Sequence, residues 1–447
     1  MAIPKLTGHW FWGSLGAFLK EPYAFPGKVA GEAGGITRFR LLHRKFIAVN
    51  HPDLYDQIMV RNAEAYERSY HFKFQQVLFG KGMITTDGPE WAAKRGRGAP
   101  AFTRDSLKKV APQNAKTAAH FLDGWDKAAD AGESIPLMSE MQKLTISIIC
   151  KSLFSVDMDH ASTAQFCDAA RESASIIRIQ NATLLRLPLW APTKTNAQLL
   201  KTRQSITDFV LDKIEKRKMS RQPGEARDIL GVLLNGREMK DLEKEEYEDI
   251  LDECKTILLA GFETTALTLS WALYLLATHP EAAVKWHDEC DRLVAEDDPS
   301  REGLEKLAYT RQVCYETMRL YPVVFTQPRV CVKNTKLGEH AVKKGELLLL
   351  SIYGMQRSSD YWDDPHTFNP DRFARDKTYP QKSYMPFGKG KHTCLGNHFA
   401  VYEMLAILSM IGKRFNLKRA DDAPVGIRST LLLMPDKEIP LFLKRRP

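Results

Sequence analysis

One cysteine stands in an unusual frame near the C-terminal end of the chain. The stretch PFGKGKHTCLGNHFA, residues 386–400, places Cys394 after a glycine-rich turn and at the start of a predicted helix. Gly388 and Gly390 permit a tight turn and the close approach of another group to the backbone. Backbone N–H groups at a helix start favour a thiolate, the reactive and metal-binding form of cysteine. These residue types allow a free thiol, a zinc ligand or a haem ligand.

Zinc is the first alternative to test against the spacing. His392, Cys394 and His398 form the pattern H-x-C-x-x-x-H. A structural zinc site needs a fourth ligand, and the usual paired C-x-x-C or H-x-x-x-H spacing is absent here. The spacing therefore disfavours zinc, and a buried structural cysteine stays open beside a haem ligand.

A second chemical feature lies in a long apolar run, TILLAGFETTALTLSWALYLLAT, at residues 256–278. Its length would span a bilayer. It contains a carboxylate, Glu263, followed by Thr264 and two further threonines, and a charge at that depth is costly in lipid. We therefore expect a helix through the core of a globular protein. A buried acid beside an alcohol is itself costly, so the pair indicates a chemical purpose.

Composition restricts the classes of function. The chain has 447 residues, and its formal net charge is 64 − 55 = +9 with the basic residues dispersed. No nucleic-acid module is recognisable, so the positive charge favours a docking face for an acidic partner. The seven cysteines are an odd and scattered set, which is typical of a reducing, cytoplasmic compartment.

The elements that must position these residues follow from periodicity and turn residues. The N-terminal apolar run from Trp10 to Leu19 is too short to span a bilayer, and we expect it to pack on the protein or touch a membrane surface. We predict one mostly helical domain, 1–447, with small β-sheets. The expected segments are two strands within 36–50, a short helix at 51–62, a long loop at 67–88, mainly helices from 90 to 219, a helix at 307–322, a strand at 345–353, a helix after Cys394 and a closing hairpin at 430–444.

The cysteine stretch matches F-x-x-G-x-x-x-C-x-G and resembles the cysteine-ligand loop of the cytochrome P-450 family. Other stretches resemble motifs of that family in the same order: EWAAKRG (W-x-x-x-R), AGFETT, YETMR (E-x-x-R), VVFTQPRV and NPDRF. The resemblance covers nearly the whole chain and points to a soluble bacterial member. It implies the mainly α cytochrome P-450 fold, a long central helix over the haem, and haem b held by a thiolate.

The resemblance also implies roles for individual residues. Cys394 is the expected iron ligand, and Glu263 with Thr264 the expected proton-delivery pair. Expected haem contacts are Trp91, Arg95, Ala260, Gly261, Arg329, Phe387, Gly388, His392 and Gly396. Glu316, Arg319 and Arg372 are expected to hold the scaffold behind the haem. Expected substrate contacts are Phe72, Phe74, Ile176, Leu259, Val323, Val324 and Phe325.

The implied function is a monooxygenase that inserts one atom of O2 into a hydrophobic small molecule: a fatty acid, terpenoid, steroid or aromatic. No flavin or iron–sulfur domain is recognisable, so we expect a separate ferredoxin or flavodoxin-type donor with its reductase, docked by Lys389, Lys391, Lys94 and Arg97. A monomer is expected. Two alternatives stay open: a haem-thiolate isomerase or dehydratase that needs no electrons, and a non-catalytic haem protein that binds ligands.

Overall fold

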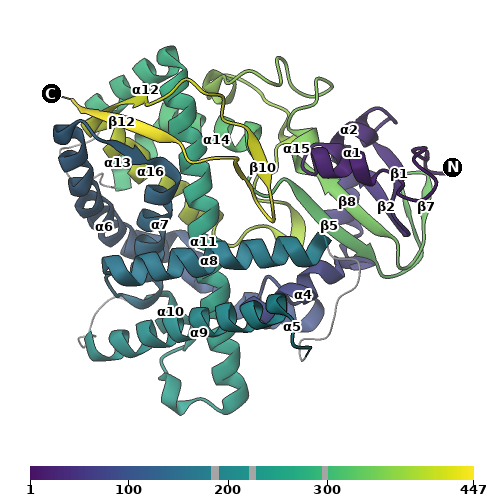
Figure 1. The fold of residues 1–447 in the computed structure, drawn as a ribbon, viewed down its shortest axis with the longest axis horizontal. Helices are drawn as coiled ribbons and strands as arrows, with labels where there is room; N and C mark the ends of the chain where they lie inside the picture. Colours follow the sequence, from purple (N-terminus) through teal and green to yellow (C-terminus); the bar gives the residue numbers. More distant parts are fainter. Residues whose placement is uncertain (183–190, 221–227, 294–300, 447) are drawn as a thin grey trace. The chain divides into compact units, whose positions relative to one another are not determined.

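The computed structural model describes residues 1–182, 191–220, 228–293 and 301–446 (Figure 1). The chain forms two compact units. The sheet unit comprises Met1–His71, Tyr315–Cys394 and Ile427–Met434. The helical unit comprises Phe72–Cys314, Leu395–Gly426 and Pro435–Pro447. Helices dominate and the sheets are small, which confirms the predicted fold class.

A five-stranded sheet organises the sheet unit, in the order β1-β2-β8-β5-β3. The strands are β1 (Ile36–Leu41), β2 (Arg44–Val49), β3 (Tyr66–Arg68), β5 (Thr326–Cys331) and β8 (Leu347–Ser351). β2 and β8 pair in parallel and the other neighbours are antiparallel. Two shorter pairs are β6 (Thr335–Leu337) with β7 (His340–Val342), and β10 (Ile427–Ser429) with β11 (Leu433–Pro435). The hairpin of β1 and β2 is the strand pair predicted around a basic turn.

The sheet unit also contains short helices. They are α1 (Leu15–Lys20), α2 (Phe25–Gly31), α3 (Pro52–Asp56), a π-helix η1 (Gln57–Arg61), α15 (Ile352–Met355) and the 3-10 turns η5 (Pro370–Phe373) and η7 (Gly390–His392). Phe25 and Val29 of α2 pack with Phe39 and Phe46 of the sheet in one apolar cluster. Burying these aromatic and aliphatic side chains fixes α2 against the sheet.

The helical unit is built around α11 (Lys244–Thr278), which runs alongside α7 (Leu137–Phe154) (Figure 1). Its other helices are α5 (Gly88–Gly98), α6 (Arg104–Ala131), α8 (His160–Ala182), α9 (Lys194–Ser220), α10 (Ile229–Leu233), α12 (Pro280–Leu293), α13 (Arg301–Lys306) and α16 (Asn397–Arg414). Of the described helices, α11 alone is long and apolar enough to cross a membrane, and most of its apolar stretch is buried inside the protein. It ends directly before His279-Pro280, as predicted.

The predicted closing hairpin at 430–444 is wrong. β12 (Pro440–Arg445) pairs with β9 (Phe415–Arg419) and with β4 (Ser134–Pro136), whereas β11 pairs with β10. Two apolar runs around a polar turn resemble a hairpin, yet the first run pairs with the preceding strand β10, and the second joins a different sheet that contains the distant strand β4. Local pattern cannot reveal such non-local partners.

The predicted long loop at 67–88 is also wrong. β3 and the helix α4 (Tyr70–Phe79) occupy most of it, and only Ser69 and 80–87 are irregular. The aromatic residues in SYHFKFQQVLF have low helix propensity, which concealed the helix. Positions 70–74 lie outside the described side chains, so the predicted contacts of Phe72 and Phe74 fall outside what the structure describes.

Candidate active site

The cysteine loop is held by its own backbone. The N–H of Cys394 donates to the carbonyl oxygen of Phe387 at 2.9 Å, and the N–H of Gly388 donates to Met385 at 3.0 Å. Thr393 donates from both its N–H and its hydroxyl to the carbonyl of Gly390, at 3.0 and 2.8 Å. These bonds fold 385–394 into consecutive turns and present the cysteine at their end. Helix α16 begins at Asn397, three residues later than predicted.

Gly388 and Gly390 are required by the protein itself. Both have a φ of +70°, the left-handed region that favours glycine. A Cβ on Gly390 would lie 1.9 Å from the carbonyl oxygen of Met59 in the π-helix η1. A Cβ on Gly388 would lie 2.9 Å from Nε2 of Gln327, whose Oε1 accepts a 2.8 Å hydrogen bond from Tyr55. The loop is therefore seated on η1 and β5 by close backbone approach.

Cys394 differs from the other cysteines. It is exposed, whereas the other six are buried. Burial raises the pKa of each of those six thiols, to about 11 for Cys167 and about 12 for Cys290 and Cys314. Raised pKa values make those six thiols poor nucleophiles and poor metal ligands. Within the described residues, no group of three or more His, Cys, Asp and Glu side chains gathers to hold a metal ion.

A buried ion-pair network supports the sheet unit. Arg319 is fully buried and forms a fork with Glu316, with Nε–Oε2 at 2.6 Å and Nη2–Oε1 at 2.8 Å. Arg372 in η5 donates to the same carboxylate at 3.0 Å. Arg319 also donates to the carbonyls of Gln356, Pro365 and Thr367. The structure thus brings the three predicted scaffold residues together and ties α14 (Ala308–Leu320) to the turn-rich segment that precedes the cysteine loop.

The basic residues predicted near propionates lie on several elements. On α5, the Arg95 guanidinium lies 5.6 Å from the ring centre of buried Trp91, as expected for i,i+4 neighbours. Arg329 on β5 is only 5% exposed. His392 is half-buried within η7. Arg329 Nη1 donates to the carbonyl of Pro328 at 2.9 Å, and the planar fork of a guanidinium suits a carboxylate ligand.

The middle of α11 has a short accessible window. Residues 253–258 and 265–273 are buried, yet Leu259, Ala260, Gly261, Glu263 and Thr264 are all partly exposed. Phe262 points the other way and packs edge-on against Phe166 of α8, with ring centres 5.3 Å apart. An accessible strip in an otherwise buried helix is the surface on which a ligand or cofactor would lie.

The polar groups of this window are poised for proton exchange. Burial raises the pKa of Glu263 from 4.5 to about 7, so near neutral pH it can both give and take a proton. The Thr264 hydroxyl donates to the carbonyl of Ala260 at 2.8 Å, which leaves its oxygen as an acceptor. Gly261 lets α7 approach closely, because a Cβ there would lie 3.2 Å from Cδ1 of Ile149.

Comparison with known proteins gives a match over nearly the whole chain. The family model described as Cytochrome P450 matches residues 3–442. The chain belongs to the cytochrome P450 family. Relatives include "Protein LUTEIN DEFICIENT 5, chloroplastic" of Arabidopsis thaliana, 29% identical over 440 residues, which cover 92% of this chain and 72% of that protein. "Cytokinin hydroxylase" of Arabidopsis thaliana is 30% identical over 384 residues, covering 82% and 72%. "Putative cytochrome P450 132" of Mycobacterium tuberculosis is 27% identical over 446 residues, covering 94% and 92%.

As a cytochrome P450 monooxygenase the chain has a haem cofactor, a substrate, O2 and a redox partner. The residues present fit a haem. Cys394 is the exposed thiol, and Arg329 is a buried cation. Gly396 differs from Gly388 and Gly390, because a Cβ there would meet nothing closer than Phe102 at 3.9 Å. No protein atom therefore requires glycine at 396, whereas a flat cofactor lying against the backbone would.

The substrate residues predicted in this P450 are mostly well packed. Ile176 on α8 is 1% exposed, and Val323 and Phe325 are buried. Val324 is partly buried against the sheet-unit core, and Leu259 lies in the accessible window of α11. All five are apolar, as a hydrophobic substrate requires.

Two of the predicted docking cations are not free. Lys94 is only 2% exposed and its Nζ lies 2.7 Å from Oδ1 of Asp249. Lys389 donates to the carbonyls of Gln381 and Lys382, and burial lowers its pKa. The docking prediction is therefore wrong for Lys94, a buried partner in an ion pair. Arg97 is partly buried, and Lys391 is exposed with no ion pair to another described residue.

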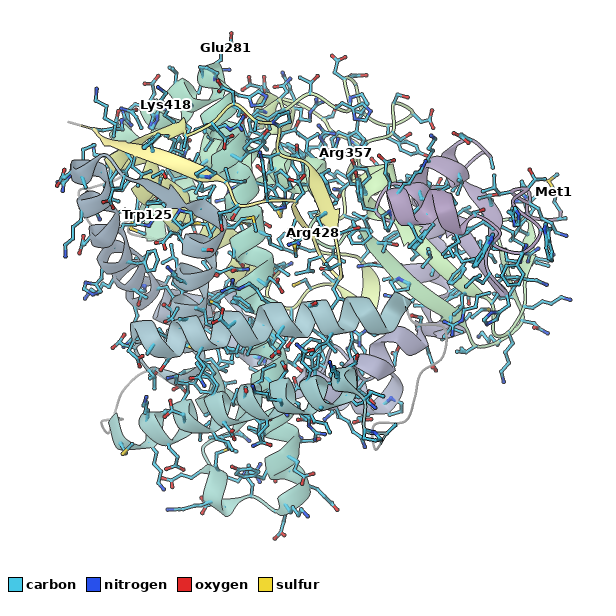
Figure 2. All side chains as sticks on the ribbon, viewed as in Figure 1. Met1, Trp125, Glu281, Arg357, Lys418 and Arg428 are labelled. Carbon is cyan, nitrogen blue, oxygen red and sulfur yellow. The ribbon has the colours of Figure 1, made fainter. Side chains whose placement is uncertain are left out.

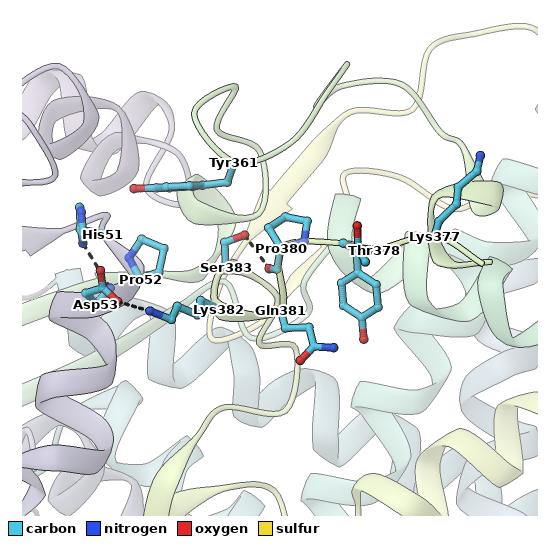
Figure 3. Close-up of a pocket in the computed structure, with 11 residues that line it drawn as sticks. His51, Pro52, Asp53, Tyr361, Lys377, Thr378, Pro380, Gln381, Lys382 and Ser383 are labelled. Atoms are coloured by element: carbon cyan, nitrogen blue, oxygen red, sulfur yellow. Dashed lines mark hydrogen bonds and ion pairs between the residues drawn. The ribbon is translucent and has the colours of Figure 1, made fainter. Parts of the chain in front are cut away.

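A surface hollow of about 650 Å³ lies beside this lysine contact (Figure 3). His51, Asp53, Tyr361 and Lys382 line it, and Lys382 is paired with Asp53 at 2.9 Å. The Asp53 N–H also donates to His51 Nδ1, which caps α3. The pairing fixes Lys382, and its carbonyl in turn receives Lys389. Lys382, which lines this hollow, therefore helps to hold Lys389 of the cysteine loop.

Sequence reasoning missed two groups of residues. Tyr55, Met59 and Gln327 hold the cysteine loop, and the sequence does not reveal this role, because their contacts with the loop are long-range. Glu253 on α11 is fully buried, and burial raises its pKa to about 7. It lies seven residues before Ala260 on the same helix stripe, and its charge next to the apolar run was the available signal.

Proposed function

We propose that this P450 holds haem b through Cys394 and oxidises a hydrophobic small organic substrate at a C–H or C=C bond. One oxygen atom enters the substrate and the other leaves as water, so each turnover consumes two electrons and two protons. The observation that carries the proposal is the accessible window of α11, where a carboxyl group with a pKa of about 7 stands next to a hydroxyl. Such a pair can supply the two protons that each oxygen-activating turnover consumes.

When bound, a thiolate-ligated haem supplies the oxygen-activating chemistry. Cys394 would hold the iron, and Trp91, Arg95, Arg329 and His392 would hold the propionates. Phe387, Gly388 and Gly396 would lie along the cofactor, with Ala260 and Gly261 on α11. These assignments rest on the exposed thiol, the buried guanidinium and the partly exposed helix stripe.

The protein's own residues would deliver the protons. Glu263 exchanges a proton between its carboxyl oxygen and water, because its pKa lies near neutral pH. The Thr264 oxygen accepts a hydrogen bond and thereby orients the proton donor, since its own proton is held by Ala260. Leu259 and the apolar side chains Ile176, Val323, Val324 and Phe325 exclude water from the substrate and bind it by apolar contact.

The electrons would come from a ferredoxin or flavodoxin-type donor, and the exposed Lys391 supports an acidic one. We expect the protein to act as a monomer. The test is a difference-spectrum screen of hydrophobic compounds with the holoprotein, followed by turnover under labelled O2 with such a donor. A labelled alcohol or epoxide is the expected product. Turnover without reductant would instead support an isomerase or dehydratase, and binding without oxygen use under any reductase would support a ligand-binding protein.

A further inference from the structure

An aromatic turn near the N-terminus is exposed to an unusual degree. Trp10 is 82% exposed, Phe11 49%, Trp12 50% and Leu19, on the following helix α1, 61%. We call these four side chains the aromatic patch. They belong to the sheet unit, at the same end of the chain as Met1 in Figure 2. Exposed single apolar residues are ordinary, but a run of three consecutive large aromatics indicates an interaction surface.

The turn that carries the patch is built rigidly. The Arg40 guanidinium donates to the carbonyls of His9 at 2.9 Å, Trp10 at 2.6 Å and Phe11 at 2.9 Å. His9 and Gly13 exchange two backbone hydrogen bonds, at 3.0 and 2.8 Å. Gly13 has a φ of +62°, and a Cβ there would lie 2.1 Å from the Arg40 carbonyl oxygen. Hydrogen bonds from Arg40 on β1 therefore fix the turn, and the exposure of its aromatic side chains does not come from a frayed chain end.

The aromatic rings pack against one another edge to face. Trp10 and Phe11 have ring centres 5.6 Å apart, and Phe11 and Trp12 4.8 Å apart with planes at 89°. Next to them lies an apolar surface groove of about 700 Å³, lined by Leu6, Trp12, Leu15, Leu19, Phe25 and Val29 among others. The patch thus continues into a groove wide enough to receive apolar chains.

Positive charge is concentrated in the N-terminal stretch that carries the patch. Residues 1–49 hold seven lysines and arginines and two glutamates, so their formal charge is 7 − 2 = +5, more than half of the chain total of +9. Lys5, Lys20, Lys28 and Lys45 are exposed, and none forms an ion pair with another described residue. The backbone of Lys5 forms a β-bridge with Arg38 on β1, and Lys45 lies opposite Arg40 in the strand register of the same hairpin. Lys20 is the last residue of α1. Cations therefore flank the aromatic side chains.

We propose that the aromatic patch and its lysines dock the protein on an anionic lipid surface. Trp10, Phe11 and Leu19 would enter the boundary between headgroups and acyl chains, where amphipathic aromatic rings are most stable. The lysines would bind anionic headgroups, each adding about 1 kcal/mol near the surface. The exposed patch offers only about 500 Å², from typical aromatic side-chain areas. A stable protein interface buries about 800 Å² on each partner, so the size favours lipid over protein.

The experiment uses the full-length holoprotein and sedimentation with two kinds of vesicle, pure phosphatidylcholine and phosphatidylcholine mixed with phosphatidylglycerol. Wild type should bind the anionic vesicles, and added salt should weaken that binding. Trp10→Ala/Phe11→Ala should weaken it at least tenfold. Lys5→Gln/Lys45→Gln should weaken it several-fold and reduce its dependence on salt. The haem content of every variant should match wild type, which shows that the fold persists.

A matched control is Met219→Ala/Val284→Ala, which removes two apolar side chains that are 77% and 59% exposed in the helical unit. This control should bind vesicles as wild type does. The proposal is overturned if wild type ignores anionic vesicles, if the control loses as much binding as the aromatic variant, or if the aromatic variant binds normally. Self-association that Trp10→Ala/Phe11→Ala abolishes, without vesicle binding, would also overturn it and assign the patch to a second copy of the chain.

Discussion

The cysteine loop and the window of α11 reach their chemistry by opposite means. The loop depends on backbone geometry: two glycines with positive φ bring it close to Met59 and Gln327, and successive turns present one exposed thiol. The window depends on side chains: it lies on a regular helix, and burial raises the pKa of Glu263. The loop should therefore fail abruptly when its geometry changes, whereas the window should fail gradually and with pH.

The difference explains how each site tolerates substitution. In the loop the N–H groups of Gly388, Thr393 and Cys394 are bonded within the loop and Gly390 lies against the Met59 carbonyl, so a methyl group added at Gly390 must displace backbone atoms. On α11 the helix persists whatever the side chain, and only the proton-transfer properties change. We expect all-or-none effects in the first region and graded, titratable effects in the second.

The largest effect should come from Cys394→Ala. Without the thiolate the reduced carbon-monoxide complex should lack its red-shifted band, and monooxygenase turnover should be lost entirely. The matched control is Cys314→Ala, which removes a buried thiol from α14. It should cost stability of about 1–2 kcal/mol through a small cavity and leave the spectrum unchanged. A red-shifted band that survives in Cys394→Ala would remove the central assignment.

Next in size is Gly390→Ala. The substitution adds a left-handed strain of about 1–2 kcal/mol and an overlap with the Met59 carbonyl, so the loop must move. We expect a large loss of haem content and a lower urea midpoint. Gly345→Ala is the control, because Gly345 has a φ of +90° but no atom within 4 Å of the added Cβ. It should show the strain alone and keep its haem. Equal behaviour of the two variants would contradict the close-approach argument.

Glu263→Gln should lower turnover by about a hundredfold, within the usual range for a lost proton-transfer group. Its pH profile is the sharper readout. Glu263 is mainly protonated below its pKa of about 7, so the wild-type rate should fall as pH rises above about 7. The turnover rate of the glutamine variant should not fall above that pH. Stability should also change, because the unfolded carboxyl ionises near 4.5 while the folded one keeps its proton until about 7. Wild type should thus lose stability as pH rises through that window, and the variant should lose less, because the contribution of Glu263 to this loss is removed while that of Glu253 remains unchanged.

Glu253→Gln separates the two readouts. Glu253 is also buried on α11 with a pKa raised to about 7. This variant should therefore also lose less stability than wild type as pH rises toward 7. Its turnover rate should still fall above pH 7 as in wild type, because Glu253 lies outside the accessible window. If the fall in rate disappears in Glu253→Gln and persists in Glu263→Gln, the proton source lies about two helical turns away from the window.

The two regions also show what a sequence can predict. The cysteine loop was predictable because close backbone approach demands glycine at fixed spacing, and that demand is visible in the letters. The long helix was likewise marked by its apolar periodicity and the Glu316–Arg319 pair by its i,i+3 spacing, whereas the contact of Arg372 with that pair was predicted only from the resemblance to the family's motifs. Tyr55, Met59 and Gln327 were not, since their partners lie far away in sequence. The raised pKa of Glu263 depends on packing by several helices, and the pairing of Lys94 with Asp249 reverses the expectation of a surface cation.

The smallest effect should come from Lys391→Glu, which tests whether the surface of the cysteine loop receives an acidic donor. Lys391 is exposed and unpaired among the described residues, so charge reversal leaves the loop intact, unlike a change at Lys389, which holds two carbonyls. Stopped-flow reduction by an acidic ferredoxin or flavodoxin should slow several-fold at low salt, and the difference should shrink above about 0.1 M, where the screening length is about 10 Å. Lys418→Glu, on β9 in the helical unit, makes the same change in net charge at an exposed position and should have little effect. If both variants slow equally, net charge alone steers the donor, and the loop has no docking role of its own.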